Sequence, residues 1–228
     1  MKAKFGMIVV AGSGKIGGHV ASKNRSGAYF RTKTTPLNPQ TPYQQETRSM
    51  LASVSKSWGS LTVEQRASFD AAAKQFGKTN VFGDAYTPTG KNFFTQININ
   101  RLLMAQTVLT TPPAPVSVPF MSIDEVAEDT GNMVLTLSSS LANTYYVKIR
   151  STKKLVGGVN FIKNMYKLLA VQVGLGTTSQ TVDAAVFTAR FGETFEGEER
   201  YGFNIQIVDK ATGIPGTPYS AIIETTSA

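Results

Sequence analysis

The segment Thr-Thr-Pro-Pro-Ala-Pro at residues 110–115 divides the chain into two parts with different spacings of apolar residues. Proline has no backbone N–H and fixes φ, so this segment favours a stiff, extended linker over a helix or a central strand. Before it, apolar residues recur every three or four positions, as in helices, and after it they alternate with polar residues, as in strands. We therefore predict an α+β protein of two modules, joined by a proline-rich linker at residues 111–118.

Residues 41–110 are predicted to form a small helical module. Thr41 followed by Pro42 is typical of a helix start, and Thr62 with Gln65 three residues later is typical of a capping box. A third helix is expected to begin near Thr89. The residues that we expect to face the core of this module are Tyr43, Met50, Leu51, Val54, Trp58, Phe69, Ala72, Phe76, Phe93, Phe94, Ile97 and Met104.

Residues 119–228 are predicted to form an antiparallel β-sandwich of the immunoglobulin or fibronectin type III kind. Short runs rich in β-branched and aromatic residues alternate there with Gly, Asn and Asp, and the length suits seven strands. A jelly roll is the second choice. The expected strands are residues 133–137, 145–150, 161–173, 201–208 and 221–225, with a hairpin turn at residues 209–213.

Residues 1–40 are predicted to form an extended basic arm that is rich in glycine. Strand-like runs at residues 6–11 and 27–32 suit a hairpin, and each interior glycine disfavours a helix by about 1 kcal/mol relative to alanine. Pro36 and Pro39 end the segment. Because few apolar residues could anchor this arm, we expect it to be weakly ordered in the isolated protein.

Charge is distributed unevenly along the chain. The net charge is +8, and residues 1–50 hold eight Lys and Arg against the single acid Glu46, whereas residues 111–228 hold nine basic and eleven acidic residues, a net of −2. Such asymmetry favours an arm that meets an anionic surface, either nucleic acid or an acidic patch on a neighbouring subunit. The simpler alternative is a solvated basic segment. The acids at residues 124–129 and 193–199 lack the ligand pattern of a calcium loop and are expected to be solvated.

The arm supplies the candidate contact residues. Its cations interleave with aromatic side chains, a mixture that contacts phosphates and stacks on bases. The competing interpretation, which we favour, is that the arm inserts into a neighbouring protein and pairs its backbone as an added strand. The candidate residues for assembly or anion contact are Lys15, Lys23, Arg25, Tyr29, Arg31 and Lys33.

The sequence offers no coherent set of residues for catalysis, cofactor binding or metal binding, and we predict a protein that is not an enzyme. The chain has no cysteine, and its one histidine, His19, has no acid near it in sequence. Gly12, Gly14 and Gly17 match the spacing of a dinucleotide-binding loop, but no acid precedes Glu46 and the sequence behind the glycines disfavours the required helix. No run approaches the ~18 apolar residues of a membrane span.

Several short motifs occur in order along the first hundred residues. They read Gly-Lys-Ile-Gly-Gly from residue 14, Asn-Arg-Ser-Gly-Ala-Tyr-Phe-Arg from residue 24 and Pro-Leu-Asn-Pro-Gln-Thr from residue 36, followed by Trp58, Leu61-Thr62, Gly90-Lys91 and Arg101. The stretch that they span resembles a largely uncharacterised family of phage and prophage proteins that is common in Bacteroidetes phages. No catalytic residues come with this family.

The resemblance implies a virion structural or virion-associated protein, made in the host cytoplasm and located in the virion. A capsid-associated place, as an auxiliary or decoration protein, is the first expectation, and a tail or connector component is the second. The expected partners are other virion proteins, either further copies of this chain or capsid and tail neighbours, and no membrane. A nucleic-acid-binding protein that uses the basic arm is the alternative from a different functional class.

Overall fold

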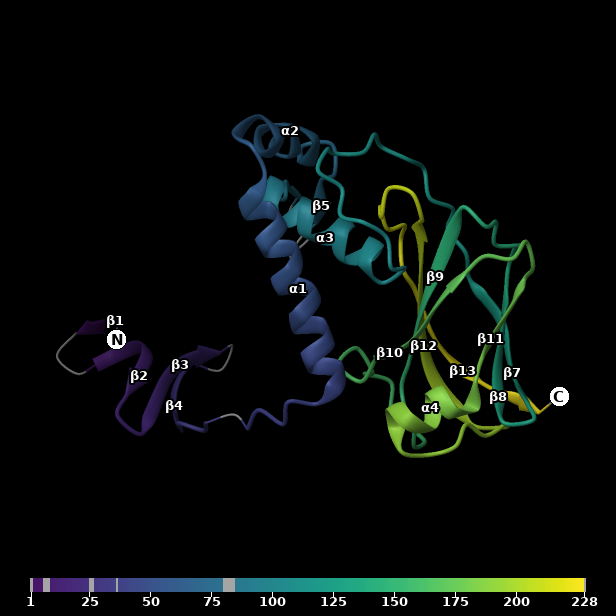
Figure 1. Cartoon of the computed structure of the whole chain (residues 1–228). Coiled ribbons are helices and arrows are strands. Elements are labelled where there is room, and N and C mark those ends of the chain that lie inside the picture. Colours follow the sequence, from purple (N-terminus) through teal and green to yellow (C-terminus); the bar gives the residue numbers. More distant parts are fainter. Residues whose placement is uncertain (1, 6–8, 25–26, 36, 80–84, 228) are drawn as a thin grey trace. The chain divides into compact units, whose positions relative to one another are not determined.

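The computed structural model describes residues 2–5, 9–24, 27–35, 37–79 and 85–227, which form a mixed α+β protein (Figure 1). The chain divides into two compact units, Met1–Gln45 and Glu46–Ala228. The first unit contains a small antiparallel sheet, and the second contains helices followed by larger sheets. The predicted order of an N-terminal arm, helices and then antiparallel strands is therefore confirmed.

Within its described residues, the arm forms a four-stranded antiparallel sheet in the order β1-β2-β3-β4. Its strands are β1 (Lys2–Phe5), β2 (Val9–Ile16), β3 (His19–Asn24) and β4 (Gly27–Thr32). Gly17 and Gly18 make the two-residue turn between β2 and β3, and Gly17 has a φ of +52°, which glycine adopts without strain. The sequence predicted β4 but missed β3, so the arm is a larger sheet than the expected hairpin. The strand expected at residues 6–11 falls partly on residues 6–8, which lie outside the described residues.

Each helix of the helical module begins directly after the threonine at which the sequence predicts its start. They are α1 (Pro42–Ser60), α2 (Val63–Ala73) and α3 (Gly90–Leu102), with the short pair β5 (Lys78–Thr79) and β6 (Ala85–Tyr86) before α3. The capping box is confirmed, because the Gln65 N–H donates to Thr62 Oγ1 at 3.3 Å and the Thr62 N–H donates to Gln65 Oε1 at 2.9 Å. Thr89 is the N-cap of α3, and its hydroxyl accepts from the Asn92 N–H.

Aromatic rings form the core between these helices. Phe69 and Phe94 are fully buried with ring centroids 5.1 Å apart, and Trp58 lies 5.2 Å from Phe94. One part of the predicted core is wrong: Tyr43, at the start of α1, and Leu51, at its middle, are exposed. The reason is length, since α1 has 19 residues and α2 and α3 have 11 and 13, so the partner helices are too short to cover all of α1.

Two larger sheets follow, and within the described residues their strand orders are β10-β9-β12-β13 and β11-β8-β7-β14. Their pairs are antiparallel except for β14, which pairs in parallel with β7. Side chains from both sheets form one hydrophobic core, which includes Leu135, Ile149 and Phe203. The strands are β7 (Ile123–Asp129), β8 (Asn132–Leu137), β9 (Tyr145–Ser151), β10 (Lys167–Val173), β11 (Ser179–Val182), β12 (Arg200–Asp209), β13 (Tyr219–Glu224) and β14 (Thr226–Ser227).

Two predictions for this region need correction. The strand expected at residues 161–173 begins only at Lys167, because residues 162–165 make a turn in which the Met165 N–H donates to the Ile162 carbonyl at 2.8 Å. A helix that the sequence did not predict, α4 (Ala184–Phe191), connects β11 to β12. Asp183 caps it at one end, and Gly192, with a φ of +77°, ends it at the other.

Buried polar contacts join the helices to the sheets of the second unit. Asn100 on α3 donates from Nδ2 to the Gly213 carbonyl at 2.8 Å, and its own carbonyl accepts from the Tyr146 hydroxyl at 2.6 Å. Ile214 lies in the hydrophobic core of the helices. The predicted linker at residues 111–118 marks the change from helices to strands, and both sides of it belong to one compact unit. That residues 119–228 fold as a separate domain stays a prediction.

We expect Tyr201 to be a sensitive position in the core of the sheets. Its ring is fully buried against Phe195 and Phe203, and its hydroxyl accepts from the Glu196 N–H at 3.2 Å. Tyr201→Phe leaves that N–H without its partner and should lower the free energy of unfolding by about 1 kcal/mol. Tyr201→Ala should lower it by about 3–5 kcal/mol. Urea denaturation measures both, and Tyr86→Phe, at an exposed position, should change it by less than about 0.5 kcal/mol.

Candidate functional site

The described residues of the arm sheet separate their side chains onto two faces. Opposite residues of an antiparallel pair lie on the same face, and successive residues along a strand lie on opposite faces. Lys15 pairs with Val20, and Val20 pairs with Arg31, so these residues form one row across β2, β3 and β4. We call this side the basic face. Its described members are Ser13, Lys15, Val20, Ser22, Tyr29, Arg31 and Lys33.

The opposite side of the arm sheet, the apolar face, is mostly open. Ala21 is 3% exposed, but its partner Phe30 on β4 is 63% exposed, and Ile16 is 39% exposed. Ala21 is the one buried side chain among those that the structure describes in the arm, at residues 12–23 and 27–35. The described members of the apolar face are Ile16, His19, Ala21, Lys23, Ala28, Phe30 and Thr32.

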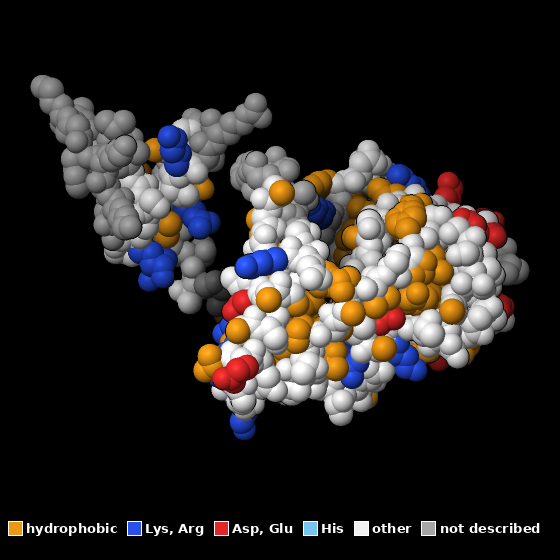
Figure 2. All heavy atoms as spheres, turned by 90° about the horizontal axis from the view of Figure 1, so that it is seen from above, with side chains coloured by type: hydrophobic (Ala, Val, Ile, Leu, Met, Phe, Trp, Pro, Cys, Tyr) orange, Lys and Arg blue, Asp and Glu red, His pale blue; other side chains and the backbone are white. Residues whose placement is uncertain are grey.

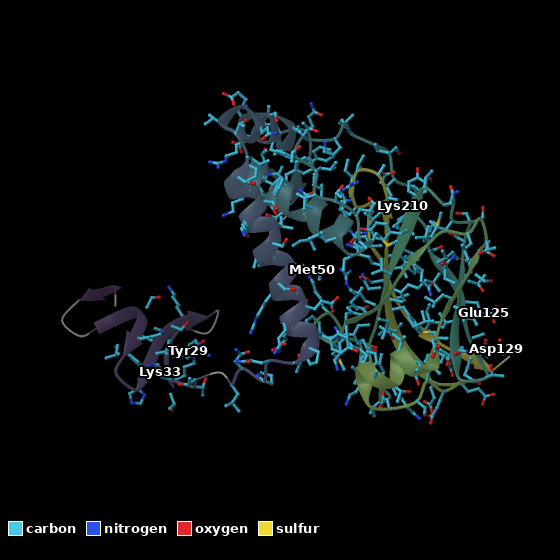
Figure 3. The ribbon with its side chains drawn as sticks, viewed as in Figure 1. Tyr29, Lys33, Met50, Glu125, Asp129 and Lys210 are labelled. Carbon is cyan, nitrogen blue, oxygen red and sulfur yellow. The ribbon has the colours of Figure 1, made fainter. Side chains whose placement is uncertain are left out.

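The six arm residues predicted from the sequence do not form one group. The basic face holds Lys15, Tyr29, Arg31 and Lys33, of which Tyr29 and Lys33 are labelled in Figure 3. Lys23 pairs with Ala28 and lies three residues after Val20 on β3. Because successive residues of a strand alternate between faces, Lys23 lies on the apolar face. Arg25 lies outside the described residues. Sequence reasoning missed Val20, whose place in the row only the strand register reveals.

A hollow of about 450 Å³ lies at one end of the basic face. Its lining residues are Lys15, Val20, Arg31, Thr32, Lys33, Thr34 and Thr35. Residues 1–45 contain seven Lys and Arg and no Asp or Glu, so the arm has no carboxylate of its own to neutralise the three cations of the hollow. In Figure 2 the described part of the arm accordingly carries blue and orange side chains and no red ones. The arrangement suits an anion.

The glycine-rich run of the arm forms a strand and a turn. Gly12 and Gly14 lie within β2, and Gly17 lies in the turn before β3. A dinucleotide-binding loop needs a helix N-terminus behind its glycines to hold the pyrophosphate, and here a strand follows instead. His19 begins this strand, pairs with Thr32, and lies in an arm without acids.

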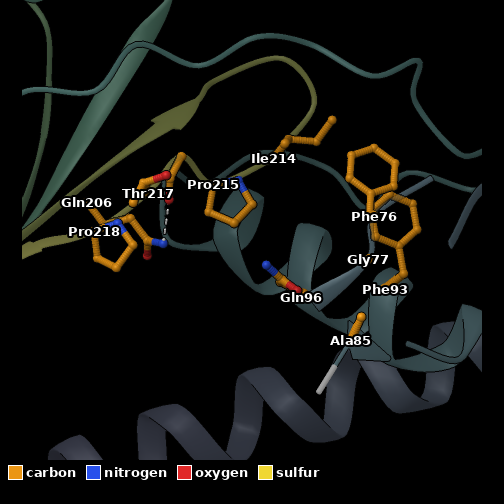
Figure 4. Close-up of a pocket in the computed structure, with 11 residues that line it drawn as sticks. Phe76, Gly77, Ala85, Phe93, Gln96, Gln206, Ile214, Pro215, Thr217 and Pro218 are labelled. Carbon is orange, nitrogen blue, oxygen red and sulfur yellow. Dashed lines mark hydrogen bonds between the residues drawn. The ribbon is translucent and has the colours of Figure 1, made fainter. Parts of the chain in front are cut away.

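The second unit contains a groove of about 930 Å³ between the helices and the loop from β12 to β13 (Figure 4). Phe76 and Phe93 stack at one side with ring centroids 4.4 Å apart, and Pro215 and Pro218 lie at the other. Its polar side chains include Gln206, whose Nε2 donates to the Gly216 carbonyl at 3.0 Å. The lining residues that the structure describes include no titratable side chain.

An ion-pair cluster lies on the loops next to β12. Lys154 Nζ lies 2.6 Å from Glu199 Oε1 and 3.0 Å from Glu196 Oε2, and the hydrogen bonds to these carboxylates raise the pKa of Lys154 above its ordinary value. The acids at residues 193–199 are expected to be solvated, and two of them, Glu196 and Glu199, also pair with this lysine at the surface. Within the part of the chain that the structure describes, no three His, Cys, Asp or Glu side chains gather as metal ligands, and no helix is long and apolar enough to cross a membrane.

Lys148 on β9 is buried at the junction between α3 and the sheets. Its Nζ donates to Asn100 Oδ1 at 3.0 Å, an amide oxygen that carries no full charge. Burial, with a smaller contribution from the nearby cation Arg150, lowers the pKa of Lys148 to about 8. Neither Lys148 nor Asn100 was a candidate from the sequence, because nothing in their local sequence distinguishes them from surface residues.

The pKa of Lys148 predicts how stability depends on pH. The unfolded chain, with a lysine pKa of ~10.4, binds more protons than the folded chain between pH ~8 and ~10.4, so this group makes stability rise with pH across that window. We expect the free energy of unfolding of the natural protein to rise relative to Lys148→Met by on the order of 1–3 kcal/mol between pH 7 and pH 10. Urea denaturation at several pH values measures this, and tyrosine titration cancels in the difference. Parallel pH profiles of the two proteins would contradict the prediction.

Comparisons with known proteins assign no family. No family model matches the chain, and no curated protein matches it. Among solved structures it is similar to the twitchin kinase region from C. elegans, at 16% identity and a TM-score of 0.26, over 50% of this chain and 17% of that one. It is also similar to a β-1,2-glucanase from Parabacteroides distasonis, at 13% identity and a TM-score of 0.26, over 51% of this chain and 14% of that one. The chain therefore spans less than a fifth of the length of either structure.

Proposed function

We propose that this chain is a non-enzymatic structural protein of a bacteriophage virion, capsid-associated as an auxiliary or decoration protein, whose arm joins neighbouring subunits. The open apolar face of the arm sheet carries this proposal. Phe30 and Ile16 are exposed there, and Ala21 is the single buried side chain among those described in the arm. Burying exposed apolar side chains against another protein removes their surface from water and stabilises the contact. The surface of a neighbouring subunit would supply such a contact.

The edges of the arm sheet support the same role. β1 and β4 are the outer strands of the sheet in the described residues, so each has backbone N–H and C=O groups along one side that pair with no strand of the arm. An added strand from another protein pairs with such an edge, and its side chains then alternate between the two faces. β4 also carries the exposed Phe30, which would extend the contact on the apolar face.

The virion assignment itself rests on the resemblance of residues 14–101 to phage and prophage proteins. That stretch contains β3, β4 and the helices α1 to α3, so the resembling part is the arm with the helical module. A tail or connector component is the second placement, because an arm that joins subunits serves either assembly. The expected partners are further copies of this chain or neighbouring capsid and tail proteins.

We also propose that the two larger sheets are a sandwich of the immunoglobulin or fibronectin type III kind. With β7 to β13 numbered as strands 1 to 7, one sheet has the order 5-2-1 and the other has the order 4-3-6-7. The immunoglobulin constant domain has sheets 1-2-5-4 and 3-6-7, so strand 4 alone has changed sheet. The short β14 and the helix α4 are additions to that pattern.

Tyr201 gives independent support for this kind of sandwich. Immunoglobulin domains have a tyrosine near the start of the sixth strand, whose hydroxyl bonds to the backbone a few residues upstream. Tyr201 is the second residue of β12, and its hydroxyl bonds to the backbone of Glu196, five residues earlier. Phe203 stands two residues later, where antibody domains have the second cysteine of their disulfide.

Two neighbouring substitutions on β4 test the role of the arm in assembly. Phe30→Asp places a carboxylate on the apolar face, and Tyr29→Asp places one on the basic face of the same strand. We expect Phe30→Asp, like deletion of residues 1–40, to lower incorporation of the protein into phage particles at least tenfold, because a buried unpaired carboxylate opposes packing. Tyr29→Asp should leave incorporation within about twofold.

Quantitative mass spectrometry of purified particles measures incorporation, with circular dichroism of each free variant as the control for folding. Normal incorporation of the protein that lacks residues 1–40 would contradict a role of the arm in assembly. Equal losses from Phe30→Asp and Tyr29→Asp would contradict the assignment of the subunit contact to the apolar face.

A further inference from the structure

We infer that the basic face of the arm binds single-stranded nucleic acid, with Lys15, Arg31 and Lys33 contacting phosphates and Tyr29 stacking on a base. This inference does not rest on the proposed role in assembly, which uses the apolar face. It rests on the strand register, on the hollow that the cations line, and on the sequence of the arm.

The register places the three cations around one point. Lys15 and Arg31 lie in the same row on β2 and β4, two strand spacings or about 10 Å apart. Arg31 and Lys33 are two residues apart along one strand, about 7 Å, and the Lys33 N–H continues the pairing by donating to the Gly18 carbonyl at 2.8 Å. These separations are close to the Debye length of about 8 Å at physiological salt, so the fields of the cations add at the hollow.

The hollow also offers neutral donors. Thr34 and Thr35 line it beside the cations, and threonine hydroxyls commonly donate to phosphate oxygens. Val20 lies between Lys15 and Arg31 in the row and closes the hollow with an apolar side chain. Grooves that bind a phosphate backbone are typically lined by cations together with hydroxyl donors.

Tyr29 distinguishes a nucleic acid from other anions. It is 39% exposed, lies on the basic face two residues before Arg31, and is paired across the sheet with Ser22, a small side chain that leaves room over the face. An aromatic ring next to a phosphate-binding groove is the arrangement on which unpaired bases stack. Bases are accessible for such stacking in a single strand, which is why we assign single-stranded rather than duplex nucleic acid.

Charge favours a phosphate chain over the acidic surface of another protein. Residues 1–45 contain seven cations and no acid, so the arm cannot form an alternating pattern of charges that matches a mixed protein surface. A nucleic-acid strand instead presents one negative charge at every nucleotide and can neutralise neighbouring cations in succession. An acidic polypeptide is nevertheless the competing ligand, and the experiment includes it.

The test uses the full chain and a fluorescently labelled oligo-dT of about 20 nucleotides, longer than the ~4–16 nucleotides of common single-strand sites. Fluorescence anisotropy at several salt concentrations gives the dissociation constant and its salt dependence. The test variant is Lys15→Gln/Arg31→Gln/Lys33→Gln. The matched control is Lys56→Gln/Lys74→Gln/Lys91→Gln, which removes the same charge from exposed lysines of the second unit.

We expect the test variant to lower the slope of log affinity against log salt by about 2, at ~0.7 for each phosphate contact, and to weaken binding at least tenfold at low salt. The control variant should change this slope by less than ~0.7, the contribution of one phosphate contact. Tyr29→Ala should weaken binding about fivefold or more and leave the slope unchanged, because it removes stacking and no charge. Lys15→Gln should weaken binding more than Lys23→Gln, which lies on the other face.

Three results would overturn the inference. Equal losses from the test and control variants would mean that binding follows net charge alone. Competition by polyglutamate as effective as that of unlabelled oligo-dT would assign the face to an acidic protein, and tighter binding of a duplex of the same length would exclude the single-strand assignment. Incorporation of the test variant into particles is measured separately, so a failure of the assembly role remains distinguishable from a failure of this inference.

Discussion

One buried asparagine fixes how the helices and sheets of the second unit meet. The Asn100 side chain accepts from Lys148 and donates to the Gly213 carbonyl, while its main-chain carbonyl accepts from the Tyr146 hydroxyl. A buried polar group without a partner costs about 1–3 kcal/mol, so this set of bonds strongly favours one arrangement of α3 against β9 and the loop after β12. Ile214 follows Gly213 directly and so lies in the core of the helices. The groove of Figure 4 lies between the helices and this loop from β12 to β13.

The helices could be predicted from the sequence because their signals are local. Thr62 with Gln65 is a capping box whatever the rest of the chain does, and the spacing of Phe93, Phe94 and Ile97 follows one helix face. Asn100 could not be predicted, since its partners lie 46 to 113 residues away and only the tertiary structure makes it buried. The helix α4 had readable signals in Asp183 and Gly192, but its apolar sequence also suits a strand.

The face on which each candidate residue of the arm lies could be predicted from the sequence only in part. Tyr29 and Arg31 share a face because they are two residues apart on one strand, which a sequence can reveal. Lys15 joins them only through the register that the two-residue turn at Gly17 sets between β2 and β3. A shift of that register by one residue would move Lys15 to the apolar face. The grouping of Lys15 with Tyr29 and Arg31 on the basic face therefore depends on one tight turn.

The position of Ile214 in the helical core also has a consequence for the order in which the chain folds. The bond between Asn100 and Gly213 closes a loop of 113 residues, and contacts so distant in sequence form late, whereas helices form early. During synthesis α1, α2 and α3 therefore leave the ribosome long before the residue that completes their core. Until that loop docks, the core of the helices lacks Ile214, and the nascent helices expose apolar surface that favours aggregation.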